Sequence, residues 1–165
     1  MKRNERTDNG KTADAMPKGA LRAAEGVRRV EIPFMGGAVV AGFPSPAEQY
    51  VERPLDLNEL LVARPAATYF VRAEGDSMEG VGIHSGDLLV VDRSLEATNG
   101  SIVIACVDGE FTVKTLRKGR GRVWLEAANP AYKPIRFKGE MELRVFGVVT
   151  ALIHQLHAVG EQAGA

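Results

Sequence analysis

The feature that most constrains the fold is the alternation of short apolar runs and tight turns that begins at residue 68. The runs are rich in valine, isoleucine and phenylalanine, and Gly- and Asp-containing turns separate them, a pattern that predicts strands. The predicted strands cover Thr68 to Ala73, Asp87 to Asp92, Ser101 to Val107, Glu110 to Leu116, Arg122 to Ala127, Ile135 to Lys138 and Glu142 to His154. Because short strands joined by tight turns pair with their neighbours, we expect a compact, mostly antiparallel β domain.

Local signals add one hairpin and two short helices. Asp108-Gly109 lies between two of the apolar runs and predicts a hairpin turn. Ser45-Pro46-Ala47-Glu48 and Asp56-Leu57-Asn58-Glu59 each place a capping side chain before residues that begin a helix. Pro54 and Pro65 should end these helices early. The expected fold is therefore mainly β with two short helices.

The N-terminal segment differs in composition from the rest. The first 26 residues carry few large apolar side chains, so they bury too little surface to offset the entropy lost on ordering. Residues 1–30 hold eight Lys/Arg and four Asp/Glu, a net charge of +4, and the remaining residues balance it with −4. We predict a flexible N-terminal arm over 1–41, a folded domain over 42–157 and a loose tail over 158–165.

Composition excludes several classes of function. The 21 Lys+Arg offset the 21 Asp+Glu, which argues against a protein held on nucleic acid by bulk electrostatics, and no direct sequence-specific nucleic-acid binding is expected. No apolar run approaches the roughly 18 residues of a membrane span, and the polar start is not a signal core, so we expect a soluble intracellular protein. Cys106 lies in an apolar run and is expected in the core. No Cys or His spacing predicts a metal or cofactor.

A candidate nucleophile follows the first predicted strand. Phe70 to Ala73 leads into Gly75-Asp76-Ser77-Met78. A serine on a tight turn after a strand presents its hydroxyl and neighbouring backbone N–H groups to one point, as a nucleophile with an oxyanion site requires. Gly-Asp-Ser also occurs in ordinary loops, so the turn alone leaves both interpretations open.

Two side chains compete as the base. His84 is near in sequence, but Gly82 to Gly86 resembles a surface turn, and no aspartate marks a Ser-His-Asp triad. Lys114 lies within the apolar strand Phe111 to Leu116, where desolvation would favour the neutral amine that can accept a serine proton. From periodicity alone, a lysine on a solvated strand face is the stronger interpretation.

Several motifs together resemble the LexA/UmuD family of self-cleaving proteins over roughly residues 30–155. They occur in the family's order: Gly75-Asp76-Ser77-Met78, Ser85-Gly86-Asp87-Leu88-Leu89-Val90-Val91-Asp92, Val113-Lys114 and Asn129-Pro130-Ala131-Tyr132. The resemblance implies that Ser77 is the nucleophile, that Lys114 is the general base, and that Gly75, Asp76 and Met78 form the oxyanion turn. It also implies the strongly bent sheet of the LexA C-terminal domain, the β-clip fold.

The family cuts itself between a small residue and glycine, upstream of the serine. Ala41-Gly42 matches this pattern and follows Ala38-Val39-Val40. A β-forming segment can add to a sheet edge beside the nucleophile, alanine fits a small pocket, and glycine allows a sharp bend. Without the serine and the lysine, the same residues would be interpreted as a flexible connector.

The resemblance also implies partners. The residues before the presumed cut lack the apolar periodicity of a helix-turn-helix domain, which favours the UmuD-like branch over LexA-type and phage repressors. That branch implies a bacterial cytoplasmic homodimer of the SOS response, cleaved with help from the RecA filament on single-stranded DNA and then serving a Y-family translesion polymerase. The arm is longer than is usual in that branch.

Alternatives are a non-cleaving binding module of the same fold and a repressor lacking its DNA-binding domain. A signal peptidase is disfavoured because the sequence shows no membrane anchor.

Overall fold

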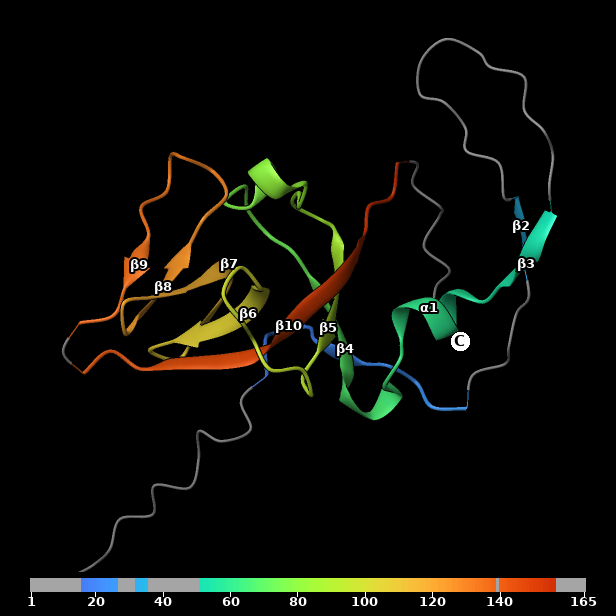
Figure 1. Cartoon of the computed structure of the whole chain (residues 1–165), viewed down its shortest axis with the longest axis horizontal. Helices are drawn as coiled ribbons and strands as arrows, with labels where there is room; N and C mark the ends of the chain where they lie inside the picture. Colours follow the sequence, from blue (N-terminus) through green and yellow to red (C-terminus); the bar gives the residue numbers. More distant parts are fainter. Residues whose placement is uncertain (1–15, 27–31, 36–50, 139, 157–165) are drawn as a thin grey trace, which may run out of the picture.

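The computed structural model describes residues 16–26, 32–35, 51–138 and 140–156 (Figure 1). Strands dominate these residues, and the predicted mainly β fold is confirmed. An eight-stranded antiparallel sheet has the order β1-β4-β5-β10-β6-β7-β8-β9, and β2 pairs with β3 separately. The elements are β1 Leu21–Arg22, β2 Ile32–Met35, β3 Val51–Leu55, α1 Leu57–Leu61, η1 Pro65–Ala67, β4 Thr68–Arg72, η2 Glu79–Val81, β5 Leu88–Asp92, β6 Ile102–Val107, β7 Glu110–Gly119, β8 Arg122–Glu126, β9 Ile135–Arg136 and β10 Leu143–Ile153.

The long strand β10 joins the two halves of the sheet (Figure 1). Its first part pairs with β6 and its last part with β5, and Val148 pairs with both neighbours. Gly147 lies where the register shifts, and a Cβ there would be 2.7 Å from Val91 Cγ1 and 3.0 Å from the Asp92 carbonyl oxygen. Only glycine allows β10 to approach β5 this closely at the junction.

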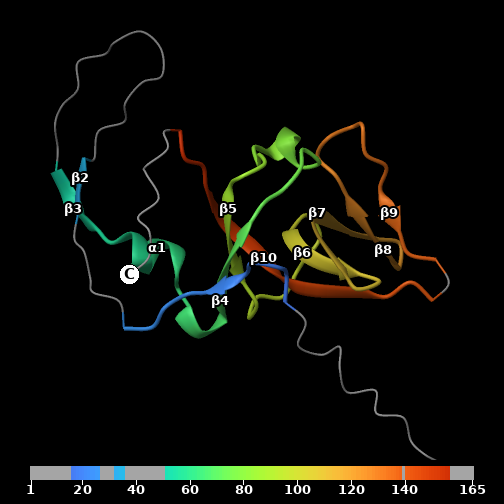
Figure 2. The same ribbon diagram turned by 180° about the vertical axis from the view of Figure 1, so that it is seen from behind.

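Two apolar clusters fill the sheet's two halves. One contains Tyr69, Leu89, Ile104 and Phe146. The other contains Val103, Ala105, Leu116 and Leu125. Both views place β8 and β9 at one end of the molecule and α1 at the other (Figure 1, Figure 2). Cys106 is buried at 7% exposure, which confirms its predicted place in the core.

The predicted hairpin is confirmed at Asp108-Gly109, which joins β6 to β7. Asp108 has φ 49° and Gly109 has φ 88°, so both turn residues adopt the left-handed backbone that a two-residue hairpin turn requires. The turn fixes the pairing of Ile102 with Thr115 and of Val103 with Lys114. This register sets Lys114 opposite Val103, which is fully buried.

The helix predictions had mixed outcomes. Asp56 caps α1, since its carboxylate accepts the Asn58 backbone N–H at 2.8 Å. The start at Ser45 to Glu48 lies outside the described residues, but its expected continuation toward Pro54 is wrong, because Val51–Leu55 forms β3. A proline is tolerated in a two-stranded sheet, where each strand has a free edge that needs no N–H donor.

The N-terminal arm is also more ordered than predicted over residues 16–26. Leu21 and Arg22 form β1 and pair with Phe70 and Tyr69 of β4, and the Ala23 N–H donates to the Thr68 carbonyl at 2.9 Å. Residue type does not predict this strand, because backbone pairing requires few apolar side chains, and Leu21 remains 67% exposed.

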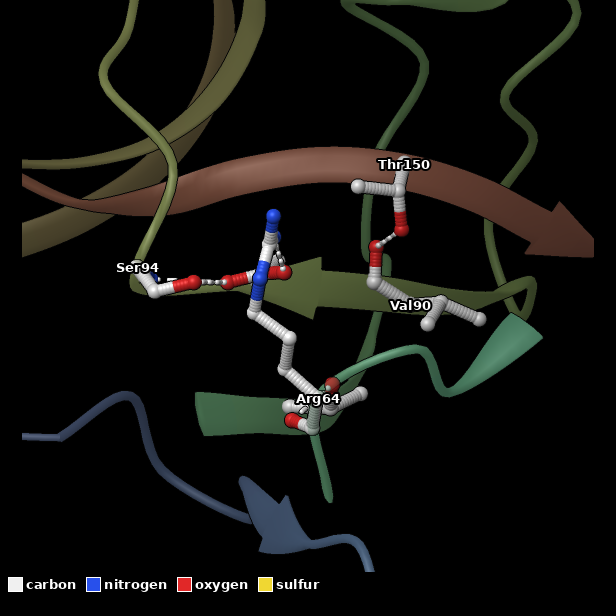
Figure 3. Close-up of polar contacts among 6 residues, drawn as sticks. Arg64, Val90, Ser94 and Thr150 are labelled. Carbon is white, nitrogen blue, oxygen red and sulfur yellow. Dashed lines mark hydrogen bonds and ion pairs between the residues drawn. The ribbon is translucent and has the colours of Figure 1, made fainter. Parts of the chain in front are cut away.

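A polar cluster ties the segment before β4 to β5 (Figure 3). Asp92, at the end of β5, binds Arg64 Nη1 at 2.8 Å and accepts the Ser94 backbone N–H and hydroxyl at 2.7 and 2.6 Å. The Thr150 hydroxyl of β10 donates to the Val90 carbonyl at 3.3 Å. The bonds from Arg64 and Ser94 satisfy the carboxylate of Asp92, a residue that is only 5% exposed.

Candidate active site

Ser77 lies on a turn between β4 and η2. Gly75 reverses the chain with φ 88°, and its N–H donates to Ser85 Oγ at 3.3 Å. Met78 is 2% exposed, and its carbonyl accepts the Val81 and Ile83 N–H groups at 3.1 and 3.3 Å. Ser77 is therefore held between a glycine reversal and a buried methionine.

The loop after β8 packs directly on this turn. The Ser77 carbonyl accepts the N–H groups of Ala128 and Asn129 at 2.9 and 3.1 Å. At Gly80, a Cβ would lie 2.0 Å from the Ala128 carbonyl oxygen, so only glycine fits there. Two backbone segments far apart in sequence thus fix the position of Ser77.

Asp76 turns toward the same loop. Asn129 Nδ2 donates to the Asp76 carbonyl at 3.2 Å and to its Oδ2 at 3.4 Å. The Tyr132 hydroxyl donates to Asp76 Oδ1, and this bond, with the nearby negative charge, raises the pKa of Tyr132 above 10.0. Asp76 therefore braces the nucleophile turn through its carboxylate.

The structure brings Lys114 of β7 to Ser77. Lys114 Nζ lies 2.8 Å from Ser77 Oγ, 2.9 Å from Thr112 Oγ1 and 2.9 Å from the Val113 carbonyl oxygen. The lysine is 8% exposed, so the expectation of a solvated strand face is wrong. The loop that carries Ser77 covers the face of β7 on which Lys114 lies. The alternation of residues within β7 cannot predict that contact.

The surroundings of Lys114 favour its neutral form. Burial lowers the pKa of the Lys114 amine from its ordinary 10.5, and no carboxylate of the described residues forms an ion pair with it. A neutral amine has two N–H donors and one lone pair. With Thr112 Oγ1 and the Val113 carbonyl accepting those N–H groups, the lone pair is left to accept the Ser77 hydroxyl proton.

Backbone amides beside Ser77 are available for an oxyanion. Within the described ranges, the N–H groups of Asp76, Ser77 and Met78 donate to no other group. Gly75 does not share this property, because its N–H is bound to Ser85 Oγ. In the turn Gly75 to Met78, Gly75 therefore supplies the backbone reversal, and the backbone N–H groups of the three residues after it are free to bind an oxyanion.

A groove of about 780 Å³ opens beside Ser77. Apolar side chains of four strands line it, among them Val71 of β4, Leu89 of β5, Ile104 of β6 and Phe111 of β7. Such a floor suits an extended apolar peptide. Ala41-Gly42 lies outside the described residues.

Comparison with known proteins identifies the family. Residues 33–150, well over half of the chain, match the model described as Peptidase S24-like. The chain belongs to this family. Protein SamA of Salmonella typhimurium is 56% identical over 115 residues, covering 70% of this chain and 79% of SamA. Protein MucA of Escherichia coli is 47% identical over 129 residues, covering 77% and 88%. The LexA repressor of Bordetella petrii is 38% identical over 150 residues, covering 88% of this chain and 66% of the repressor.

These matches confirm the predicted resemblance to the LexA/UmuD family and its UmuD-like branch. In this S24-like chain, the described residues contain no helix with the length and apolar character that a membrane crossing needs. Sequence reasoning missed the roles of Gly80, Asn129 and Tyr132 as supports of the nucleophile turn. Asn129 to Tyr132 belongs to the family motifs, but its contact with Asp76 joins residues 53 and 56 positions apart, which no local pattern indicates.

Proposed function

We propose that this protein is a self-cleaving serine peptidase with Ser77 as nucleophile, Lys114 as general base and Ala41-Gly42 as the scissile bond. The observation that carries the proposal is the 2.8 Å contact between Lys114 Nζ and Ser77 Oγ in a site that lowers the lysine pKa. Membership of the Peptidase S24-like family supports the same chemistry. On this proposal residues 1–41 are a removable arm and 42–157 the peptidase domain.

The reaction proceeds in two steps. The neutral amine of Lys114 takes the Ser77 proton as Oγ attacks the Ala41 carbonyl carbon, and the N–H groups of Ser77 and Met78 stabilise the oxyanion. Lys114 then returns the proton to the Gly42 nitrogen as the peptide bond breaks and an Ala41 ester forms on Ser77. In the second step, Lys114 deprotonates a water that attacks the ester and releases the Ala41 carboxylate with Ser77 restored.

Cleavage of this kind has to be gated. A tethered substrate can reach an effective molarity of about 10⁵ M or more, so a segment held permanently beside Ser77 would be cut at once. The gate is docking of the Ala41-Gly42 segment in the groove next to Ser77. The family resemblance supplies the trigger, the RecA filament on single-stranded DNA.

The cut would change the surface of the domain. It removes β1 with the rest of residues 1–41, so the edge of β4 loses its backbone partner. The shortened chain, residues 42–165, acts as a homodimeric accessory subunit of a Y-family translesion polymerase in the bacterial cytoplasm during the SOS response. The similarity to SamA and MucA supports this UmuD-like role.

Intact mass measurement of the purified protein tests the proposal. Incubation at mildly alkaline pH, with and without an activated RecA filament, should yield fragments ending at Ala41 and starting at Gly42. Ser77→Ala should stay whole under both conditions. A cut at another bond would refute the site assignment, and an uncut chain under every condition would favour a binding module that does not cleave.

A further inference from the structure

Three side chains that take no part in the Ser77 site lie close together where β5 begins and β10 ends. The ligand-type atoms of His84, Asp87 and His154 all lie within 4.8 Å of one another. His154 Nδ1 is 2.5 Å from Asp87 Oδ1, His84 Nδ1 is 3.9 Å from Asp87 Oδ2, and the two imidazole rings have centroids 5.3 Å apart. Two imidazoles and one carboxylate are a ligand set for divalent transition metals.

The backbone fixes where these side chains begin. Leu88 pairs with Ile153 in the β5–β10 register, so Asp87 and His154 are the next residues outward on adjacent strands. The turn from His84 to Asp87 is closed by the Asp87 N–H, which donates to the His84 carbonyl at 3.2 Å. Backbone pairing therefore brings the three residues together before any metal binds, which lowers the entropic cost of binding.

The carboxylate of the cluster is buried, and its nearest side-chain partners are the two imidazoles. Asp87 is 3% exposed, and in the described part of the chain its carboxylate forms no ion pair with lysine or arginine. The His84 ring nitrogen lies 3.9 Å from Asp87 Oδ2, which is too distant for a hydrogen bond, so His154 alone donates to or accepts from this carboxylate through its ring.

We propose that His84, Asp87 and His154 form a binding site for Zn²⁺. Tetrahedral Zn²⁺ with ligand bonds of about 2.1 Å places ligand atoms about 3.4 Å apart, between the 2.5 and 3.9 Å measured here. The side chains of His84 and His154 are 51% and 44% exposed, so both can rotate to the metal and it can enter from solvent. A fourth position is left for water.

A bound Zn²⁺ would link the end of β10 to the turn from His84 to Asp87, which is hydrogen-bonded to the strand end that leads to Ser77. Gly86 N–H donates to the Ala73 carbonyl at 2.9 Å, and the Ala73 N–H donates to the Asp87 carbonyl at 2.8 Å. Neither Ser77 nor Lys114 is a ligand. A failure to bind Zn²⁺ would therefore leave the proposed self-cleavage untouched, and a failure to cleave would leave the proposed Zn²⁺ site untouched.

Calorimetric titration of the chelator-treated Ser77→Ala chain with ZnCl₂ tests the site, because that variant stays whole during the measurement. One Zn²⁺ should bind per chain and raise the melting temperature, and MgCl₂ should do neither. His84→Ala and His154→Ala should each weaken binding by at least about tenfold, since even residues that only orient a metal ligand contribute about 10–100-fold. Co²⁺ in place of Zn²⁺ should give the visible absorption of a four-coordinate site, which both variants should lose.

The third histidine provides the matched control. His157→Ala should leave Zn²⁺ affinity and the Co²⁺ spectrum unchanged, because the proposal does not use His157, which lies outside the described residues. The proposal is overturned if the parent chain binds no Zn²⁺, if affinity survives in both His84→Ala and His154→Ala, or if His157→Ala alone abolishes it. Circular dichroism of each variant separates ligand loss from unfolding.

Discussion

Lys114 Nζ lies 2.8 Å from Ser77 Oγ, although 37 residues separate the two along the chain. Thr112 Oγ1 and the Val113 carbonyl oxygen hold the same amine from the other side, at 2.9 Å each. These contacts fix the orientation of the lysine side chain and leave its amine facing the Ser77 hydroxyl. Both the cleavage rate and the stability of the protein should therefore depend on this amine.

Replacing the amine by an apolar group of similar length should abolish cleavage without loss of the fold. Lys114→Met should lower the self-cleavage rate by at least about 10³-fold, the order seen when a catalytic base is removed. Its free energy of unfolding should be unchanged or higher, because a buried amine is replaced by a thioether. Lys133→Met, at an exposed lysine, is the control. Cleavage by Lys114→Met within tenfold of the parent rate would exclude Lys114 as the base.

The rate of cleavage should rise with pH. Below its pKa the amine carries a proton and cannot accept another from Ser77, and burial places that pKa below 10.5. The pH–rate profile should therefore have its midpoint below 10.5. A flat profile, or a midpoint at or above that value, would contradict the assignment.

The same pKa predicts how stability depends on pH. Between the lowered pKa of folded Lys114 and the ordinary 10.5, the unfolded chain binds more protons, so this residue makes stability rise with pH across that window. Urea unfolding of Ser77→Ala at several pH values should show a rise that Ser77→Ala/Lys114→Met lacks. Equal slopes in both proteins would show that the folded-state pKa is not lowered.

Gly80 should not tolerate a side chain. An added Cβ would lie 2.0 Å from the Ala128 carbonyl oxygen, so the loop that binds the Ser77 carbonyl must move. Gly80→Ala should cost about 1–3 kcal/mol of stability, the usual range for overpacking, and slow cleavage as well. Gly119→Ala is the matched control, because its Cβ would make only ordinary contact with Trp124, at 3.5 Å. Similar unfolding curves for the two variants would contradict the packing argument.

Asp92 should contribute to stability in a pH-dependent way. Burial alone would raise the pKa of Asp92, but hydrogen bonds from Ser94 and the pairing with Arg64 hold it below 3.8. Its contribution is present above pH 3.8 and is lost as the pH falls through the lower folded-state value. Asp92→Asn should cost about 1–3 kcal/mol at pH 7 and reduce the loss of stability in acid, whereas the exposed Glu96→Gln should do neither. Chemical unfolding between pH 2 and 7 measures both effects.

Removal of residues 1–41 should uncover β4. The backbone amides of Tyr69 and Phe70, the residues that β1 pairs with, should exchange hydrogen faster in a chain beginning at Gly42 than in uncut Ser77→Ala. Exchange in β6 should stay the same, since β6 is paired on both sides. Unchanged protection of β4 would show that β1 does not cover this edge in solution, or that another chain replaces it.

Most strands of the eight-stranded sheet could be predicted from local pattern. Runs of β-branched residues bounded by turns located β4 to β10 to within a few residues, and Asp108-Gly109 located a hairpin. The same reasoning failed where little side-chain burial is involved. β1 rests on backbone pairing with β4, and β3 contains Pro54, which is tolerated only because its sheet has two strands.

The amino-acid sequence by itself determined the order of the strands along the chain, the glycine turn before Ser77 and the motifs that indicate the family. These depend on residue type and near neighbours, which act over a few positions. Only the tertiary structure decided that Lys114 is buried at Ser77, that Asn129 and Tyr132 brace Asp76, and that His154 meets His84 and Asp87. The physical reason is that each depends on which strands pair and in what register, a choice made by packing of the whole chain.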